Sequence, residues 1–161
     1  MFIKTVTYTD FNGNSCSEEL AFNLTKSELR KVELESNEPM SAKLERVYGK
    51  KVLSELVKTI SEFVHMSYGK RSSDGSSFIK KKPDGSLLVD DFEQTAAYDA
   101  FMNELYESDT MLIDFCVGIF PADVQAVIKD EAAKNDAKLA EYLNGGSASS
   151  DAGASMMAPL T

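Results

Sequence analysis

The chain has 161 residues, which fits one folded domain, and 43% of them are hydrophobic, enough for a sizeable core. It carries 26 acidic against 17 basic residues, and the net charge of −9 argues against general binding to nucleic acid or to an anionic membrane. No stretch approaches the ~20 apolar residues of a membrane span, and the N-terminus lacks the apolar segment of a signal peptide. Cys16 and Cys116 fit no metal or disulfide pattern, so we expect reduced thiols in a cytoplasmic protein.

Two strands of a β-hairpin are predicted over residues 2–9 and 16–24, because the first is rich in β-branched and aromatic residues. An Asn-Gly pair between them suggests a two-residue turn, but that register would divide the apolar side chains between the two faces. A three-residue loop over 11–13 keeps them together and places Phe2 opposite Phe22. We therefore predict the longer loop.

The next segment has a strong helix-start signal. Thr25 and Glu28 have the spacing of a capping box, and Leu24 and Leu29 stand at the two positions of a hydrophobic staple. A helix is therefore predicted over 26–36.

Apolar residues at helical spacing predict a second helical region from about residue 41, with a strong pattern from 51 and a C-terminal cap at Gly69. Residues 69–88 contain two Asp-Gly turns and one proline. They are predicted to form a long loop or a short hairpin.

Asp90 and Asp91 are interpreted as helix-capping residues, so a helix is predicted to start at one of them. Its expected buried side consists of Phe92, Ala96, Ala97, Phe101, Met102 and Leu105. Another short helix is predicted after Ser108 or Asp109. Its wide apolar stripe, from Met111 to Phe120, is more typical of a core than of a docking face.

A last helix is predicted over 122–143, followed by small, flexible residues at 145–161 that we expect to form a disordered tail. The predicted fold class is α+β, mainly α: an N-terminal β-hairpin, then five or six helices and the tail. One folded domain should cover 1–144, with the hairpin in 2–24 and the helical part in 25–144.

The sequence contains no pattern typical of catalysis or of metal binding. The single histidine, His65, lies beside the apolar stripe of a predicted helix, and no serine or cysteine motif accompanies it. The cysteines and histidine form no cluster, and Asp90-Asp91 lacks the spaced carboxylates of a calcium loop. We expect no catalytic residue, no cofactor and no metal site, and interpret His65 as an ordinary helix residue.

A basic cluster lies within this acidic chain, in the loop or hairpin that follows residue 69. It is either a solvated loop or a contact for an acidic partner surface. The residues that we expect to bind a partner are Tyr68, Lys70, Arg71, Phe78, Lys80, Lys81 and Lys82.

Several stretches together resemble the tail assembly chaperones of long-tailed, siphovirus-type bacteriophages. They are MSYGKRSSDGSSFIK (66–80), DDFEQTAAYDAFMNEL (90–105) and FCVGIFP (115–121), and KTVTYTDFNGN…EELAFNLTKSEL (4–29) is similar to the same group. Each motif is short, and their order and spacing carry the resemblance, which covers about residues 4–121.

The resemblance implies a non-enzymatic protein of the host cytoplasm that is absent from the mature virion. Such proteins bind the long, largely helical tape-measure protein and keep it soluble while tail-tube subunits polymerise around it. The implied partners are the tape-measure protein, the tail-tube subunit and a longer frameshift product of the same gene. Self-association into a homo-oligomer is a further expectation that the sequence leaves open. Two alternatives remain: a minor structural protein of the virion tail or connector, and an acidic inhibitor that mimics DNA.

Overall fold

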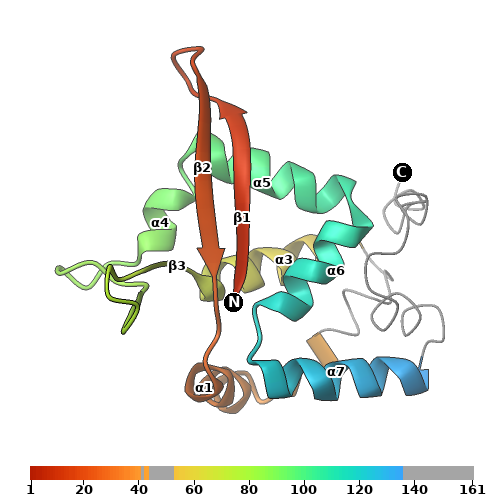
Figure 1. Cartoon of the computed structure of the whole chain (residues 1–161). Coiled ribbons are helices and arrows are strands. Elements are labelled where there is room, and N and C mark those ends of the chain that lie inside the picture. Colours follow the sequence, from red (N-terminus) through yellow and green to blue (C-terminus); the bar gives the residue numbers. More distant parts are fainter. Residues whose placement is uncertain (41, 44–52, 136–161) are drawn as a thin grey trace.

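The computed structural model describes residues 1–40, 42–43 and 53–135 (Figure 1). The strands are β1 (Phe2–Thr9), β2 (Ser15–Phe22), β3 (Tyr68–Arg71) and β4 (Phe78–Ile79), and the helices are α1 (Lys26–Ser36), α3 (Leu53–Ser67), α4 (Leu88–Phe92), α5 (Ala96–Glu107), α6 (Asp109–Gly118) and α7 (Ala122–Asn135). The fold class is the predicted one, α+β and mainly α, with an N-terminal hairpin and six helices in the described part. None of the helices in these ranges is both long and apolar enough to cross a membrane.

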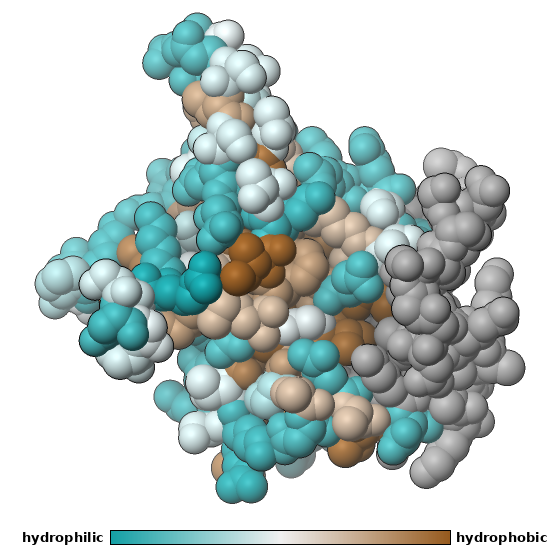
Figure 2. Space-filling model, viewed as in Figure 1, coloured by the Kyte–Doolittle hydropathy of each residue, from teal (hydrophilic) through white to brown (hydrophobic). Residues whose placement is uncertain are grey.

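The N-terminal hairpin has the predicted register, with Phe2 opposite Phe22. Gly13 adopts a left-handed backbone, φ 86°, and its N–H donates to the Asp10 carbonyl at 3.0 Å, as in a three-residue loop with glycine in the bulge position. The Asp10 carboxylate also accepts the backbone N–H of Asn14 at 2.8 Å. The tip of this hairpin projects beyond the helices, and Figure 2 shows mainly hydrophilic residues there.

Helix α1 has the predicted bounds and the predicted capping box. The Thr25 hydroxyl accepts the N–H of Glu28, and the Glu28 carboxylate accepts the N–H of Thr25. Both staple residues, Leu24 and Leu29, are buried, which fixes the angle at which the chain leaves the sheet.

The end of α3 differs from the prediction. No glycine cap follows it: the chain passes from Ser67 directly into β3, which pairs with β2 and sets Gly69 opposite Ala21. Gly69 is needed for space, because a Cβ there would lie 2.5 Å from Phe78 Cε1 and 2.7 Å from the carbonyl oxygen of Ile79. The predicted cap is therefore wrong, and the glycine instead allows close packing inside the sheet.

Of the two predicted forms of residues 69–88, the short hairpin is present. Strands β3 and β4 pair antiparallel and complete a sheet of order β1-β2-β3-β4. Gly75 and Gly85 both have positive φ, of 74° and 90°, so each Asp-Gly pair forms the predicted turn. The second turn is closed by an isolated bridge between Lys81 and Leu87.

The helix expected at Asp90 or Asp91 is divided in two. Both carboxylates lie in the first turn of α4, whose N-cap is Leu87 without a side-chain bond, so their interpretation as capping residues is wrong. The capping hydroxyl belongs to Thr95, which starts α5 and also donates to the carbonyl of Phe92 at 2.6 Å. The Thr95 hydroxyl thus forms one hydrogen bond with the end of α4 and another with the start of α5, where it accepts the N–H of Tyr98. The extended backbone of Thr95 separates the two helices.

The last two described helices follow the predicted starts. The Ser108 hydroxyl caps α6, and Pro121 immediately precedes α7. Helix α7 is described to Asn135, so the rest of the predicted helix and the predicted tail, 145–161, lie outside the described residues. In the helical region predicted from residue 41, residues 41 and 44–52 also lie outside the described part, whereas the strong pattern predicted from 51 is helix α3 from Leu53 to Ser67.

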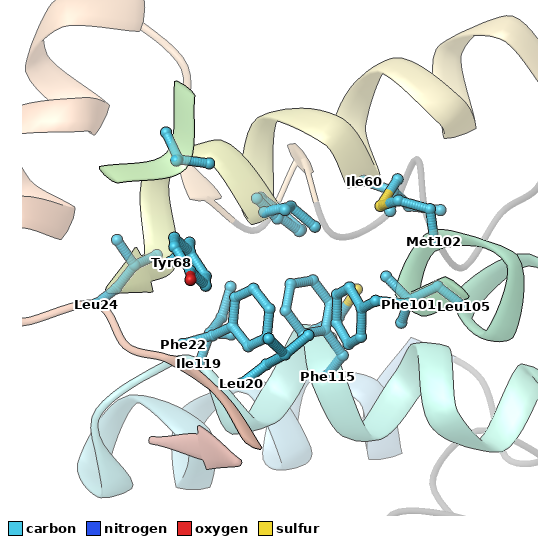
Figure 3. Close-up of a cluster of buried hydrophobic side chains, with 14 of the residues drawn as sticks. Leu20, Phe22, Leu24, Ile60, Tyr68, Phe101, Met102, Leu105, Phe115 and Ile119 are labelled. Carbon is cyan, nitrogen blue, oxygen red and sulfur yellow. The ribbon is translucent and has the colours of Figure 1, made fainter. Parts of the chain in front are cut away.

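The core lies between the sheet and the helices behind it, with α5 and α6 packed on β1 (Figure 1). Phe22 is its centre: its ring stacks on Phe101 at 4.7 Å and meets Phe115 edge-on at 5.3 Å (Figure 3). The apolar stripe of α6 is core, as expected: Leu112, Phe115, Cys116, Ile119 and Phe120 are all buried.

Candidate protein-binding site

The predicted basic residues lie on and after the β3–β4 hairpin, where the pairing divides them between two faces. Lys70 is opposite Ile79, and Arg71 is opposite Phe78. Residues directly opposite each other in an antiparallel pair share a face, so Lys70 belongs with Ile79 and Arg71 with Phe78. Figure 2 shows hydrophilic atoms over most of this hairpin.

The face of Arg71 is occupied by contacts within the fold. Arg71 forms an ion pair with Glu19 on β2 at 3.2 Å, and the half-buried Phe78 ring covers Gly69. Lys80 Nζ lies 5.7 Å from the centroid of the Phe78 ring, on the same side of the hairpin. These side chains join the hairpin to its neighbours and leave little of this face for a partner.

Lys80 is a structural residue as well. Its mostly buried ammonium donates to Glu28 Oε1 at 2.8 Å and to the carbonyl of Met66 at 2.9 Å. Burial lowers the pKa of Lys80, and the adjacent Glu28 only partly offsets this. Burial alone would raise the pKa of Glu28, but the hydrogen bonds from Lys80 and Thr25 outweigh it and lower that pKa.

Lys82 and Tyr68 are also held by the fold. Lys82 forms an ion pair with Asp91 on α4, and the hydrogen bond to that carboxylate raises the pKa of Lys82. Tyr68 is buried, and its ring stacks on Phe92 with centroids 4.0 Å apart. Burial raises the pKa of Tyr68 to about 12, so its hydroxyl remains protonated at neutral pH.

Lys70, Ile79 and Lys81 are exposed residues on and directly after the hairpin, on the face away from Arg71 and Phe78. Ile79 is 43% exposed, and both lysines are exposed. Lys81 follows Ile79 by two positions, the spacing that returns a side chain to the same face of an extended chain. Within the described residues, neither lysine has an acidic partner. We call these three residues the hairpin face: one apolar side chain with two exposed lysines near it.

Of the seven residues predicted from sequence, the structure therefore places Lys70 and Lys81 on the hairpin face. The other five, Tyr68, Arg71, Phe78, Lys80 and Lys82, make contacts within the fold. Sequence reasoning missed Ile79. The signal was present: the Asp74-Gly75 turn sets the register of the hairpin, and the register sets which residues share a face.

A second group of side chains was not anticipated. His65 Nδ1 lies 2.9 Å from Glu93 Oε1, and Asp90 is close to both, with one donor atom of each residue within 4.8 Å of the others. Sequence reasoning interpreted His65 as an ordinary helix residue, because its neighbours here come from a different element 28 residues away. This is the one group of three or more potential metal ligands among the described residues.

The two thiols are unpaired, as expected. Cys116 is fully buried and burial raises its pKa, so it is a core side chain and not a nucleophile. Cys16 is half-buried on β2, and burial together with the charge of Asp10 also raises its pKa.

One comparison with known proteins gives a match. A family model described as phage tail assembly chaperone matches residues 1–157, nearly the whole chain. No curated protein and no solved structure matches the chain.

Proposed function

The chain belongs to the phage tail assembly chaperones, and from this premise we propose that it binds the tape-measure protein and keeps it soluble while the tail tube assembles. The supporting observation is the family match over residues 1–157. A tape measure, as the resemblance implies, is a long and largely helical chain. Until the tube encloses it, the apolar stripes of its helices are exposed and prone to aggregation. Covering these stripes is a task of binding, and it requires no catalytic residue.

The hairpin face is the contact that we propose for this partner. Ile79 offers apolar area, Lys70 lies opposite it on β3, and Lys81 follows it by two positions; both lysines are exposed and form no ion pair within the described part of the chain. This arrangement fits an amphipathic helix that carries an apolar stripe bordered by acidic residues. Acidic residues of the partner would attract these two lysines, whereas the chain as a whole carries a net charge of −9 and would repel acidic residues.

The location that we propose is the host cytoplasm, with the chaperone leaving before the virion is complete. Mass spectrometry of purified particles tests this part: the chain should be absent from them. Its presence at a fixed number of copies would instead favour a minor structural protein of the tail or connector.

The binding test uses the tape-measure protein of the same phage, immobilised, and measures association with this chain at low and high salt. The variant Lys70→Ser/Ile79→Ser/Lys81→Ser should associate at least about tenfold more slowly at low salt, because rim charges mainly raise the association rate. Its fold should be intact, since exposed substitutions change stability by about 0.5 kcal/mol or less.

The chain offers a matched control on other elements. Lys31→Ser/Leu34→Ser/Lys58→Ser removes two exposed lysines and one exposed apolar residue away from the hairpin. It should associate like the unchanged chain. Equal losses in the two variants would show that charge alone matters and not this face, and the absence of any complex with the unchanged chain would refute the proposed function itself.

A further inference from the structure

His65, Asp90 and Glu93 form a cluster that the proposed function does not use. His65 lies in the last turn of α3, Asp90 lies in α4, and Glu93 is the residue that ends α4. The spacing of three between the two acids places both carboxylates on one side of this short helical segment, which faces the imidazole. One ring nitrogen and two carboxylate oxygens therefore converge from two elements, within 4.8 Å of one another.

We propose that these three residues bind a divalent transition-metal cation, with zinc as the best fit. Imidazole nitrogen with carboxylate oxygen is a donor set typical of zinc, whereas calcium and magnesium prefer sites made of oxygen alone. Two carboxylates and a neutral imidazole carry a charge of −2, which a dication neutralises. All three residues are exposed, so water can complete the coordination.

Charges around the cluster are compatible with a cation. Lys82 is the basic residue whose charge interacts with Asp90, but its ion-pair partner is the adjacent Asp91. In the absence of metal, the hydrogen bond between His65 and Glu93 holds two of the three ligands at 2.9 Å. The ligands are therefore gathered before the cation arrives, which reduces the ordering that binding requires.

The position of the cluster gives the metal a structural consequence. The segment between His65 and Glu93 contains the whole β3–β4 hairpin. Tyr68 and Phe92, whose rings stack on each other, lie near the two ends of this segment. A cation held at both ends would close this segment at its base. Because metal would bind the folded state and not the open segment, it would stabilise the fold and keep the hairpin on the sheet.

The test is calorimetric titration of ZnCl2 into tag-free, metal-depleted protein at pH 7.5. We expect one saturable site, and an increase in melting temperature of about 5 °C or more at a hundredfold excess over Kd. His65→Ala and Asp90→Asn should each weaken binding at least about tenfold, since the loss of mere supporting partners already costs 10–100-fold. Asp90→Asn keeps both partners of the His65–Glu93 hydrogen bond and the shape of residue 90, so it tests the carboxylate ligand with little change to the fold.

Three controls separate this site from incidental binding. Asp99→Asn removes an exposed carboxylate on α5, and Cys16→Ser removes the half-buried thiol; both should bind zinc as the unchanged chain does. Excess calcium should leave the zinc titration unchanged. The proposal is overturned if no saturable heat appears, or if His65→Ala and Asp90→Asn bind zinc with unchanged affinity, which would leave His65 and Glu93 as a surface ion pair alone.

Discussion

Glu28 and Lys80 form an ion pair of 2.8 Å that spans 52 residues of sequence and joins the start of α1 to the residue after β4. The same Glu28 carboxylate accepts the N–H and the hydroxyl of Thr25 in the capping box. One side chain thus starts a helix and anchors the β3–β4 hairpin, so the stability of the two elements is coupled. This anchor sets Lys80 apart from Lys70 and Lys81, which belong to the same basic cluster in sequence.

The coupling predicts that two lysines of the basic cluster contribute very differently to the free energy of unfolding. Lys80→Ser should lower the free energy of unfolding by about 1–2 kcal/mol, because it removes a charged hydrogen bond that is mostly buried. Lys70→Ser should change it by about 0.5 kcal/mol or less. Urea unfolding of the two lysine variants, of Glu28→Gln, which keeps the capping-box acceptor, and of the double variant Lys80→Ser/Glu28→Gln measures these effects and forms a double-mutant cycle. Additive effects of Lys80→Ser and Glu28→Gln would contradict the coupling.

Acid should weaken the turn at the tip of the β3–β4 hairpin when the Asp74 carboxylate becomes protonated. The hydroxyl of Ser72 and the N–H and hydroxyl of Ser76 donate to the Asp74 carboxylate and lower its pKa to about 2. The folded-state pKa is below the unfolded value of about 3.9, so this carboxylate stabilises the turn above pH ~4. That contribution disappears as the pH falls through about 2. A carboxyl 13C titration should show this midpoint, and an ordinary midpoint near 4 would show that the turn bonds are absent in solution.

Gly69 should be far less tolerant of alanine than Gly118. At Gly69 the added Cβ would meet the Ile79 carbonyl oxygen at 2.7 Å, and this backbone atom cannot move without disturbing the β3–β4 pairing. At Gly118 the closest contact is Phe2 Cδ2 at 3.2 Å, a side chain that can shift. We expect Gly69→Ala to cost about 1–3 kcal/mol and Gly118→Ala clearly less. Thermal unfolding of the two variants checks the order, and equal costs would contradict it.

The aromatic core should depend on Phe22 and not on Phe11, although both lie in or beside the N-terminal hairpin. Phe22 is fully buried and its ring contacts those of Phe101 and Phe115, so Phe22→Ala should cost about 3–5 kcal/mol. Phe11 is 85% exposed at the hairpin tip, and Phe11→Ser should leave the melting temperature unchanged within about 2 °C. A large loss in Phe11→Ser would mean that the tip packs against something in solution, such as a second copy.

Local signals in the sequence predicted local structure well. The capping box gave the bounds of α1, and the demand for one apolar face selected the three-residue loop that sets Phe2 opposite Phe22. The pairing of β3 with β2 was missed because β2 lies more than forty residues earlier, and no local pattern reports such a contact. The break between α4 and α5 was missed because Asp90 and Asp91 resemble caps as much as Thr95 does.

The candidate site could be predicted in composition but not in arrangement. The sequence shows five basic residues close together, but it does not show that Glu19, Glu28 and Asp91 pair with three of them. Each of those acids comes from a different element, so its proximity depends on the tertiary fold. The same reason hid the cluster at His65, whose partners follow it by 25 and 28 residues.

The central claim is that this chain keeps a tape-measure protein soluble, and co-expression measures it most directly. The tape-measure protein of the same phage is produced alone, with this chain, and with the Lys70→Ser/Ile79→Ser/Lys81→Ser variant, and its soluble fraction is quantified after centrifugation. The account predicts that the unchanged chain raises the soluble fraction severalfold, that the two proteins elute together in size-exclusion chromatography, and that the variant does so less well. A soluble fraction that is the same with and without this chain would contradict the account.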